Sequence, residues 1–134
     1  MPTLQEGEKC SVLLVEDHKG LRQELRSLLS KHEDIDVIGD VGDGLQALKF
    51  ITSSQPHVVV LDLNMPWMDG IEAAGFIKQS WPEIAIIGLC MTQDAYTVDA
   101  FLRAGATAVI SKSDKTYELP SAIKRVCPRR PAAA

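Results

Sequence analysis

Five short apolar runs alternate with segments of helical periodicity along this chain. The runs are Ser11–Val15, Ile35–Val41, His57–Leu61, Ile84–Leu89 and Thr107–Ser111. The first, third and fourth are almost continuously apolar, which is typical of strands buried on both faces, whereas the second alternates and indicates an edge strand. Strands that alternate with helices across short loops predict an α/β fold, a doubly wound parallel sheet with helices on both faces.

A stripe of apolar residues at helical spacing follows each run and predicts a helix there. Asp43 is expected to cap the second helix, Asp69-Gly70 to form a turn and cap before the third, and Gly105 to end the fourth. The residues of the stripes are Leu21, Leu25, Leu28 and Leu29; Leu45, Leu48 and Ile51; Ile71, Ala74 and Ile77; Val98, Phe101 and Leu102; and Leu119, Ile123 and Val126.

Length and composition predict one ordinary globular domain. The 134 residues are 46% hydrophobic and 24% charged, which argues against disorder. The net charge of −4, with no basic run longer than Arg129-Arg130, argues against direct binding to nucleic acid. No apolar stretch is long enough to cross a membrane, and the N-terminus lacks the pattern of a signal peptide. We therefore expect a cytoplasmic location.

Cysteine and histidine positions suggest no special chemistry. Cys10, Cys90 and Cys127 are too few and too scattered for a disulfide framework or a zinc site, and a domain of this length needs neither. We interpret Cys10 and Cys127 as structural or incidental, and Cys90 as a small packed residue. His57 is expected to face solvent or to cap an element, and His18 to lie in a loop.

The predicted strands deliver polar side chains to one edge of the sheet, where ligands bind in open parallel sheets. Two unit charges about 4 Å apart cost on the order of 4 kcal/mol at an effective dielectric of 20, so clustered carboxylates either raise a pKa or hold a hard cation. Oxygen ligands favour Mg²⁺, with Mn²⁺ as a substitute. A carboxylate, Mg²⁺ and a lysine together suit attack by the carboxylate on phosphorus. The residues at this edge are Glu16, Asp17, Asp62, Cys90 with Thr92 just beyond, and Lys112.

These residues resemble the receiver domain of two-component response regulators. The resemblance rests on Glu16-Asp17, on the segment DLNMPWMDG that begins at Asp62, on Gly105-Ala106 and on Lys112, and it covers roughly residues 9–126. The spacing from Asp62 to Lys112 is most similar to that of receivers that precede a helix-turn-helix DNA-binding domain. The resemblance implies a flavodoxin-like (βα)5 fold with strand order 2-1-3-4-5.

The resemblance also implies a role for each matching residue. Asp62 is the expected phosphoacceptor, Asp17 a direct Mg²⁺ ligand and Glu16 a ligand through water. The main-chain carbonyl of Asn64 is expected to complete the protein's share of the metal shell, and Lys112 to contact the phosphoryl oxygens. Such a domain takes its phosphoryl group from a sensor histidine kinase, or from a small donor such as acetyl phosphate, and hydrolyses it slowly. It is a signalling domain in a phosphorelay, not otherwise an enzyme.

Three positions depart from the family pattern. Cys90 stands at the usual Ser or Thr position, and a thiol is a weak hydrogen-bond donor. Thr92, two residues on, is a candidate substitute that requires a rearranged loop. Val109 stands where many receivers carry an aromatic residue that moves on activation. Ser113 follows Lys112 in place of the common proline, so no cis peptide is implied.

Residues 9–127 are the expected receiver, residues 1–8 an N-terminal tail, and residues 128–134 a C-terminal tail or the start of a linker. A DNA-binding output domain that regulates transcription is the expected continuation. The sequence does not settle whether the chain forms homodimers; the surface of the fourth helix, fifth strand and fifth helix is where many receivers pair. Trp67 is expected to be a partly exposed loop aromatic near Asp62, and it is a candidate contact for a partner.

Two other functions stay open on the residues. An interaction module of the same fold, no longer signalling through phosphate, is suggested by Cys90 and Val109. A phosphatase that uses a phospho-aspartate needs a second carboxylate two residues after its nucleophile, and Asn64 stands there. Nucleotide kinase activity lacks the G-x-x-x-x-G-K-[ST] loop.

Overall fold

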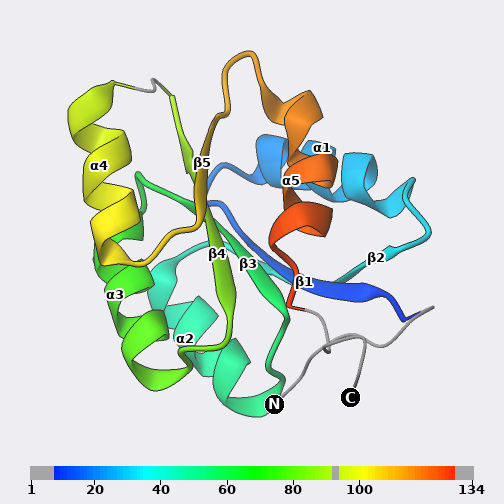
Figure 1. Cartoon of the computed structure of the whole chain (residues 1–134), viewed down its shortest axis with the longest axis horizontal. Helices are drawn as coiled ribbons and strands as arrows, with labels where there is room; N and C mark the ends of the chain where they lie inside the picture. Colours follow the sequence, from blue (N-terminus) through cyan, green and yellow to red (C-terminus); the bar gives the residue numbers. More distant parts are fainter. Residues whose placement is uncertain (1–7, 92–93, 129–134) are drawn as a thin grey trace.

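The computed structural model describes residues 8–91 and 94–128 of the chain. Its core is one sheet of five parallel strands in the order β2-β1-β3-β4-β5 (Figure 1). The expected fold class and strand order are confirmed. The strands are β1 (Cys10–Val15), β2 (Ile35–Val41), β3 (Val58–Asp62), β4 (Ala85–Cys90) and β5 (Ala108–Ser111).

Helices cover both faces of the sheet because residues on the buried strands point alternately to either side. From β1, Val12 and Leu14 join the core beneath α1 and α5, while Leu13 and Val15 join the core beneath α2, α3 and α4. The helices are α1 (Lys19–Ser30), α2 (Gly44–Ser53), α3 (Gly70–Ser80), α4 (Ala95–Ala104) and α5 (Leu119–Val126), with a 3-10 turn, η1 (Thr116–Glu118), before the last.

The predicted helix ends are confirmed by their caps. The Asp43 side chain accepts a hydrogen bond from the Gln46 N–H at 2.8 Å. Asp69 and Glu72 form a reciprocal capping box that begins α3 directly after the loop from β3. Gly105 ends α4 with φ of 120°, a conformation that side chains other than glycine rarely adopt. The polar residues between the apolar runs therefore fix where each helix starts and stops.

The apolar stripes are only partly buried. Leu45 on α2 is 53% exposed and Leu102 on α4 is 44% exposed, although both belong to the apolar stripes that predicted these helices. Small residues such as Ala47 on α2 and Ala73 on α3 share the buried positions with large ones such as Ile51 and Phe101.

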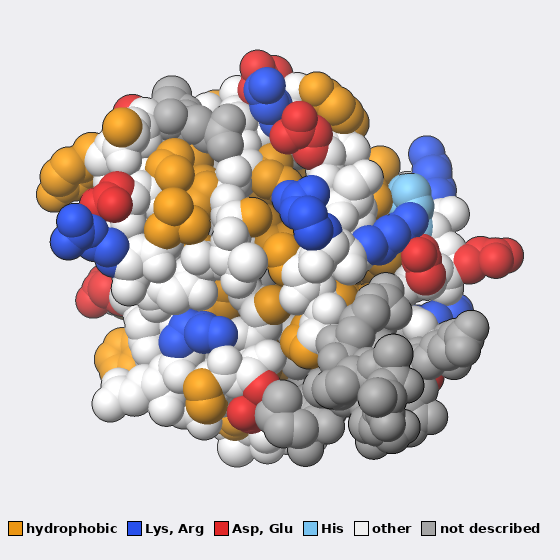
Figure 2. Space-filling model, in the orientation of Figure 1, with side chains coloured by type: hydrophobic (Ala, Val, Ile, Leu, Met, Phe, Trp, Pro, Cys, Tyr) orange, Lys and Arg blue, Asp and Glu red, His pale blue; other side chains and the backbone are white. Residues whose placement is uncertain are grey.

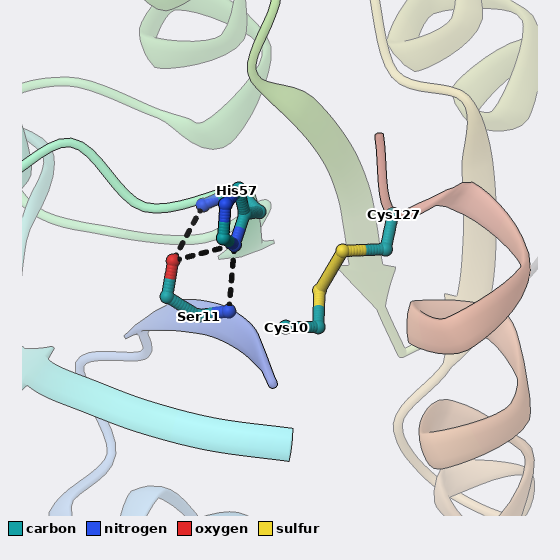
Figure 3. Close-up of a disulfide and its surroundings, with 4 residues drawn as sticks. All are labelled: Cys10, Ser11, His57 and Cys127. Carbon is teal, nitrogen blue, oxygen red and sulfur yellow. Dashed lines mark hydrogen bonds between the residues drawn. A yellow bond between two sulfur atoms is a disulfide. The ribbon is translucent and has the colours of Figure 1, made fainter. Parts of the chain in front are cut away.

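The expectation that the cysteines are too scattered for disulfide bonding is wrong for two of them. Cys10 at the start of β1 and Cys127 at the end of α5 form a disulfide, with their Cα atoms 6.4 Å apart (Figure 3). Successive crossovers bring these two ends of the domain together, and a separation of 117 residues gives no local signal of it. Cys90 is buried and is not part of the disulfide.

His57 also departs from expectation, because it is half-buried and its ring is engaged. Its Nδ1 accepts a hydrogen bond from the Ser11 backbone N–H at 2.9 Å. The backbone N–H of His57 in turn donates a hydrogen bond to the Ser11 hydroxyl oxygen at 3.0 Å. Burial lowers the pKa of His57, while the charge of Glu8 opposes that shift. His57 is therefore a polar link between the starts of β1 and β3.

Across the described residues, no helix has the length and apolar character needed to cross a membrane.

Candidate functional site

Three carboxylates lie together at the carboxyl ends of β1 and β3. Oxygen atoms of Glu16, Asp17 and Asp62 all lie within 4.8 Å of one another. Glu16 and Asp62 are fully buried, whereas Asp17 is exposed. These two central strands run parallel, so the residues that follow them share one edge of the sheet. The acidic cluster predicted from the strand ends is therefore present.

Lys112 bridges the two buried carboxylates. Its Nζ lies 2.8 Å from Asp62 Oδ1 and 3.2 Å from Glu16 Oε1. The lysine side chain is only 9% exposed, and its backbone N–H donates to the Cys90 carbonyl at 2.9 Å. The bond to β4 fixes the start of the side chain, and the two carboxylates fix its end. A buried ammonium here offsets part of the repulsion between the acids.

Asp62 keeps one oxygen unpaired. Oδ1 accepts from Lys112, but Oδ2 is buried and has no hydrogen-bond partner among the described residues. Burial raises the pKa of Asp62 to about 7; the hydrogen bond from Lys112 opposes that rise and the charge of Glu16 adds to it. Burial alone would lower the pKa of Lys112, but its hydrogen bonds and the charges of Asp62 and Glu16 raise it.

This donor set fits a hard cation. A buried, unpaired carboxylate oxygen costs free energy unless a ligand satisfies it, and two further carboxylates stand beside it. The three residues offer only oxygen atoms, which Mg²⁺ prefers. The residues present therefore agree with the metal expected from the sequence.

Two contacts from α1 and its cap hold Glu16 in place. The His18 N–H donates to Glu16 Oε2 at 3.0 Å, and Arg22 Nη1 donates to the Glu16 carbonyl oxygen at 2.8 Å. His18 also caps α1, since its Nδ1 accepts from the Leu21 N–H at 3.2 Å. Sequence reasoning did not find Arg22, because an arginine one turn into a helix carries no motif signal.

The loop after Asp62 passes close beneath the site at Gly70. A Cβ at Gly70 would overlap the backbone carbonyl oxygen of Asp62. The Gly70 N–H donates to the Leu63 carbonyl at 2.7 Å, which closes the loop onto the end of β3. The sequence predicted a turn and a cap at Asp69-Gly70 and missed this close approach, although the Asp-Gly pair signals the turn.

Trp67 projects from the same loop. Its side chain is 81% exposed, more than the partial exposure expected, and its backbone φ is 66°. A residue other than glycine rarely holds this left-handed conformation, which costs roughly 1–2 kcal/mol. The loop that follows Asp62 therefore holds a large aromatic side chain in solvent.

The remaining predicted residues lie on β4, on β5 and in the loop after β3. Cys90 ends β4 in a buried position, and burial, then the charges of Asp94 and Asp62, raise the pKa of its thiol. The thiol is therefore neutral at pH 7. Asn64 lies exposed in the loop after β3, and Val109 is half-buried in β5. Thr92 lies outside the described residues.

Comparison with known protein families identifies the family of this chain. The model of the response regulator receiver domain matches residues 12–124, nearly the whole described chain. The chain belongs to the response regulator receiver family. Receivers of this family are phosphorylated on an aspartate and bind Mg²⁺ in their acidic pocket. The resemblance stated from the sequence is therefore confirmed.

Curated relatives and solved structures agree with this membership. The receiver is 34% identical over 113 residues to the transcriptional regulatory protein LiaR of Bacillus subtilis. This alignment covers 84% of the receiver chain and 54% of LiaR. The receiver is 37% identical over 131 residues to a protein-glutamate methylesterase/protein-glutamine glutaminase of Pseudomonas syringae, covering 95% of this chain and 37% of that one. A LuxR-family DNA-binding response regulator from Staphylococcus aureus superposes with a TM-score of 0.80 at 29% identity, covering 87% and 98% of the two chains.

The chain thus spans about half the length of LiaR, or less for the methylesterase. What the comparisons establish for this chain is the receiver itself.

Proposed function

We propose that this receiver accepts a phosphoryl group on Asp62 from a sensor histidine kinase and switches an output domain in response. The observation that carries the proposal is the environment of Asp62. One of its oxygens is held by Lys112 at 2.8 Å, and the other is buried and unpaired beside two more carboxylates. An oxygen without a hydrogen-bond partner is free to form a new bond.

In this proposal the Asp62 carboxylate attacks phosphorus. The new O–P bond forms as the P–N bond to the kinase histidine breaks, and the imidazole leaves with the bonding electron pair. With a small donor such as acetyl phosphate, the P–O bond breaks instead. Lys112 stands within hydrogen-bonding distance of Asp62 and supplies the positive charge that the transferred phosphoryl oxygens require.

Mg²⁺, when bound, would neutralise the carboxylates and lower the pKa of Asp62 so that the nucleophile is ionised. Asp17, Asp62 and the main-chain carbonyl of Asn64 are the proposed direct ligands. Glu16 is proposed to act through water, because Lys112 and the His18 N–H already occupy its two oxygens. Cys90 takes the position of the usual Ser or Thr at the phosphoryl group, with Thr92 as its candidate substitute.

The domain limits proposed are 9–127 for the receiver, with a linker beginning at 128. LiaR, a transcriptional regulatory protein in which the matching segment accounts for 54% of the length, supports a role in transcription. The DNA-binding response regulator from Staphylococcus aureus supports a DNA-binding output domain. The methylesterase relative shows that a receiver-like segment also stands in a protein with an enzymatic output. A cytoplasmic location follows from this role and completes the proposal.

The proposed homodimer surface lies over α4, β5 and α5. Hydrophobic and charged side chains are interspersed in the upper part of Figure 2. A groove of about 390 Å³ opens on this surface, lined by Val109, Tyr117 and Ala122 among others. Tyr117 is 68% exposed, so its burial in a dimer would remove apolar surface from water.

Intact-protein mass spectrometry tests the phosphoacceptor. The chain is incubated with Mg²⁺ and acetyl phosphate or phosphoramidate, beside Asp62→Asn and a matched surface control, Asp36→Asn on the edge strand β2. We expect one phosphoryl group on the native chain and on the Asp36 variant, and none on the Asp62 variant. Incorporation that survives Asp62→Asn would show that another residue is the acceptor.

A second function is favoured by the neutral, buried Cys90. A receiver whose phosphoryl group meets a weak donor could serve as an interaction module that no longer signals through phosphate. A panel of histidine kinases separates the two functions. No phosphorylated form with any small donor or kinase, while Mg²⁺ still binds, would favour the module.

A further inference from the structure

The disulfide lies at the opposite end of β1 from the acidic cluster. Cys10 begins this strand and Glu16 directly follows it, so roughly 20 Å separates the two at about 3.3 Å per residue. The disulfide joins Cys10 to Cys127, which caps the end of α5 through its N–H to the Ile123 carbonyl (Figure 3). It therefore fastens the last helix of the receiver to the central strand.

The hydrophobic core extends far beyond this bond, although Cys10 and Cys127 both belong to one of its two clusters. Both faces of the sheet carry continuous buried clusters, and those clusters include residues from α1 to α5. Domains of this length commonly fold on such cores alone. In a reducing compartment, which the proposed function implies, disulfides are mostly transient and sense redox conditions.

The position of the bond makes it accessible by a small motion. Cys10 is 1% exposed and Cys127 is 5% exposed, so both sulfurs are shielded while α5 is complete. Cys127 lies just beyond the last turn of α5, and helix ends open locally at far lower cost than the whole domain. Opening of that one turn would expose the sulfurs and leave the sheet intact.

A metal site is the competing interpretation of the same residues. Ligand atoms of Cys10, His57 and Cys127 lie within 4.8 Å of one another. The hydrogen bond from the Ser11 N–H, however, occupies the lone pair of His57 Nδ1. The neutral ring then carries its hydrogen on Nε2, and neither nitrogen is left to bind a cation. The geometry favours covalent pairing of the two sulfurs over metal binding.

We propose that Cys10 and Cys127 form a reversible redox latch that controls whether the end of α5 is fixed to β1. In the closing reaction, the two thiols lose two protons and two electrons as the S–S bond forms. A small disulfide such as oxidised glutathione accepts these and becomes two thiols. The latch rests on the proposed function, because it is at the end of α5 that the linker to an output domain begins. Oxidation fixes the end of α5 to β1, and reduction frees it.

The test equilibrates the folded chain in glutathione buffers from strongly reducing to strongly oxidising. The samples are then denatured, alkylated and weighed. We expect two populations, with one alkyl group on the oxidised form, at Cys90, and three on the reduced form. We expect them to interconvert within this range of buffers while the chain stays folded. A bond that stays closed in the most reducing buffer, or never forms in the most oxidising one, would overturn the latch.

Two further measurements separate the alternatives. Amide hydrogen exchange in the last turn of α5 should be faster in the reduced chain and in Cys127→Ser than in the oxidised chain, while exchange in β3 is unchanged. Stoichiometric Zn²⁺ binding to the reduced chain that Cys10→Ser abolishes would replace the latch by a metal site. Phosphorylation at Asp62 is measured in both redox forms. Its absence from both would refute the proposed function while the alkylation result still decides the latch.

Discussion

The two ends of β1 carry opposite chemistry. At its carboxyl end, three carboxylates that repel one another lie together, and Lys112 forms ion pairs with two of them. At its amino end, two thiols and an engaged imidazole meet in a site that a covalent bond closes. The charged site is held by strands and their neighbouring loops, whereas the sulfur site joins the first strand to the last helix. The comparison shows that one strand can position a reactive site at one end and, independently, anchor the last helix of the domain at the other.

The largest expected effect is at the amino end. Reduction of the disulfide should lower the free energy of unfolding by about 2–4 kcal/mol, because it frees a loop that spans most of the chain in the unfolded state. Urea denaturation with and without reductant measures this. Cys127→Ser should match the reduced protein and show no further change with reductant. Phosphorylation should be the same in both forms, and a loss of phosphorylation on reduction would show that the two ends are coupled.

Gly70→Ala should have the next largest effect, at the charged end. Its Cβ would overlap the Asp62 carbonyl, so the loop must shift, at a cost of about 1–3 kcal/mol. Phosphorylation should slow as well, since Asp62 moves with that loop. Gly75→Ala is the matched control on the same helix, because its Cβ would meet nothing within 4 Å.

The control should gain roughly 0.5–1 kcal/mol, since alanine favours a helix over glycine. Thermal unfolding and the rate of phosphoryl gain report on both variants. Equal stability of the two variants would mean that the approach of Gly70 to Asp62 does not restrict the loop.

Asp62→Asn should stabilise the chain above pH 7 when a chelator keeps Mg²⁺ away. Burial raises the pKa of Asp62 from 3.8 to about 7, so the folded state binds this proton more tightly than the unfolded state. The stability of the native chain relative to the variant therefore falls as pH rises from about 4 through 7. Urea denaturation of both proteins from pH 4 to 8 checks the sign. A gap that does not change with pH would show that Asp62 is ionised throughout.

The smallest effect expected is the response to Mg²⁺. At ten times its dissociation constant, a bound ion stabilises the folded state by about 1.4 kcal/mol. This gain in thermal stability should vanish in Asp17→Asn, whose exposed side chain leaves the core intact, and should persist in Asp36→Asn. A gain that both variants keep would place the cation elsewhere on the domain.

The sequence predicted the charged end well because its signals are local. Parallel strands bring their ends to one edge, so the acidic pair, Asp62 and Lys112 could be placed together from the apolar runs alone. Asp43, Asp69 and Gly105 gave the helix ends through side-chain and backbone preferences that act within one turn. The strand order came from the family resemblance, since apolar runs do not order strands.

The other end could not be predicted, because its contacts join residues far apart in the chain. The pairing of Cys10 with Cys127 depends on how the first strand and the last helix meet after every crossover is made. The link between His57 and Ser11 likewise joins the starts of two strands. Arg22 is a third example, because its contact with the Glu16 carbonyl requires the exact angle of α1.

In its oxidised form, the receiver is close to a closed ring. A single cut in the backbone anywhere between Cys10 and Cys127 leaves two pieces that the disulfide still holds as one molecule. A protease that nicks a surface loop would leave the mass on a non-reducing gel unchanged, and fragments would separate only after reduction. The same closure suits the domain to circular permutation, because new ends opened in a loop would leave its two natural ends tied together.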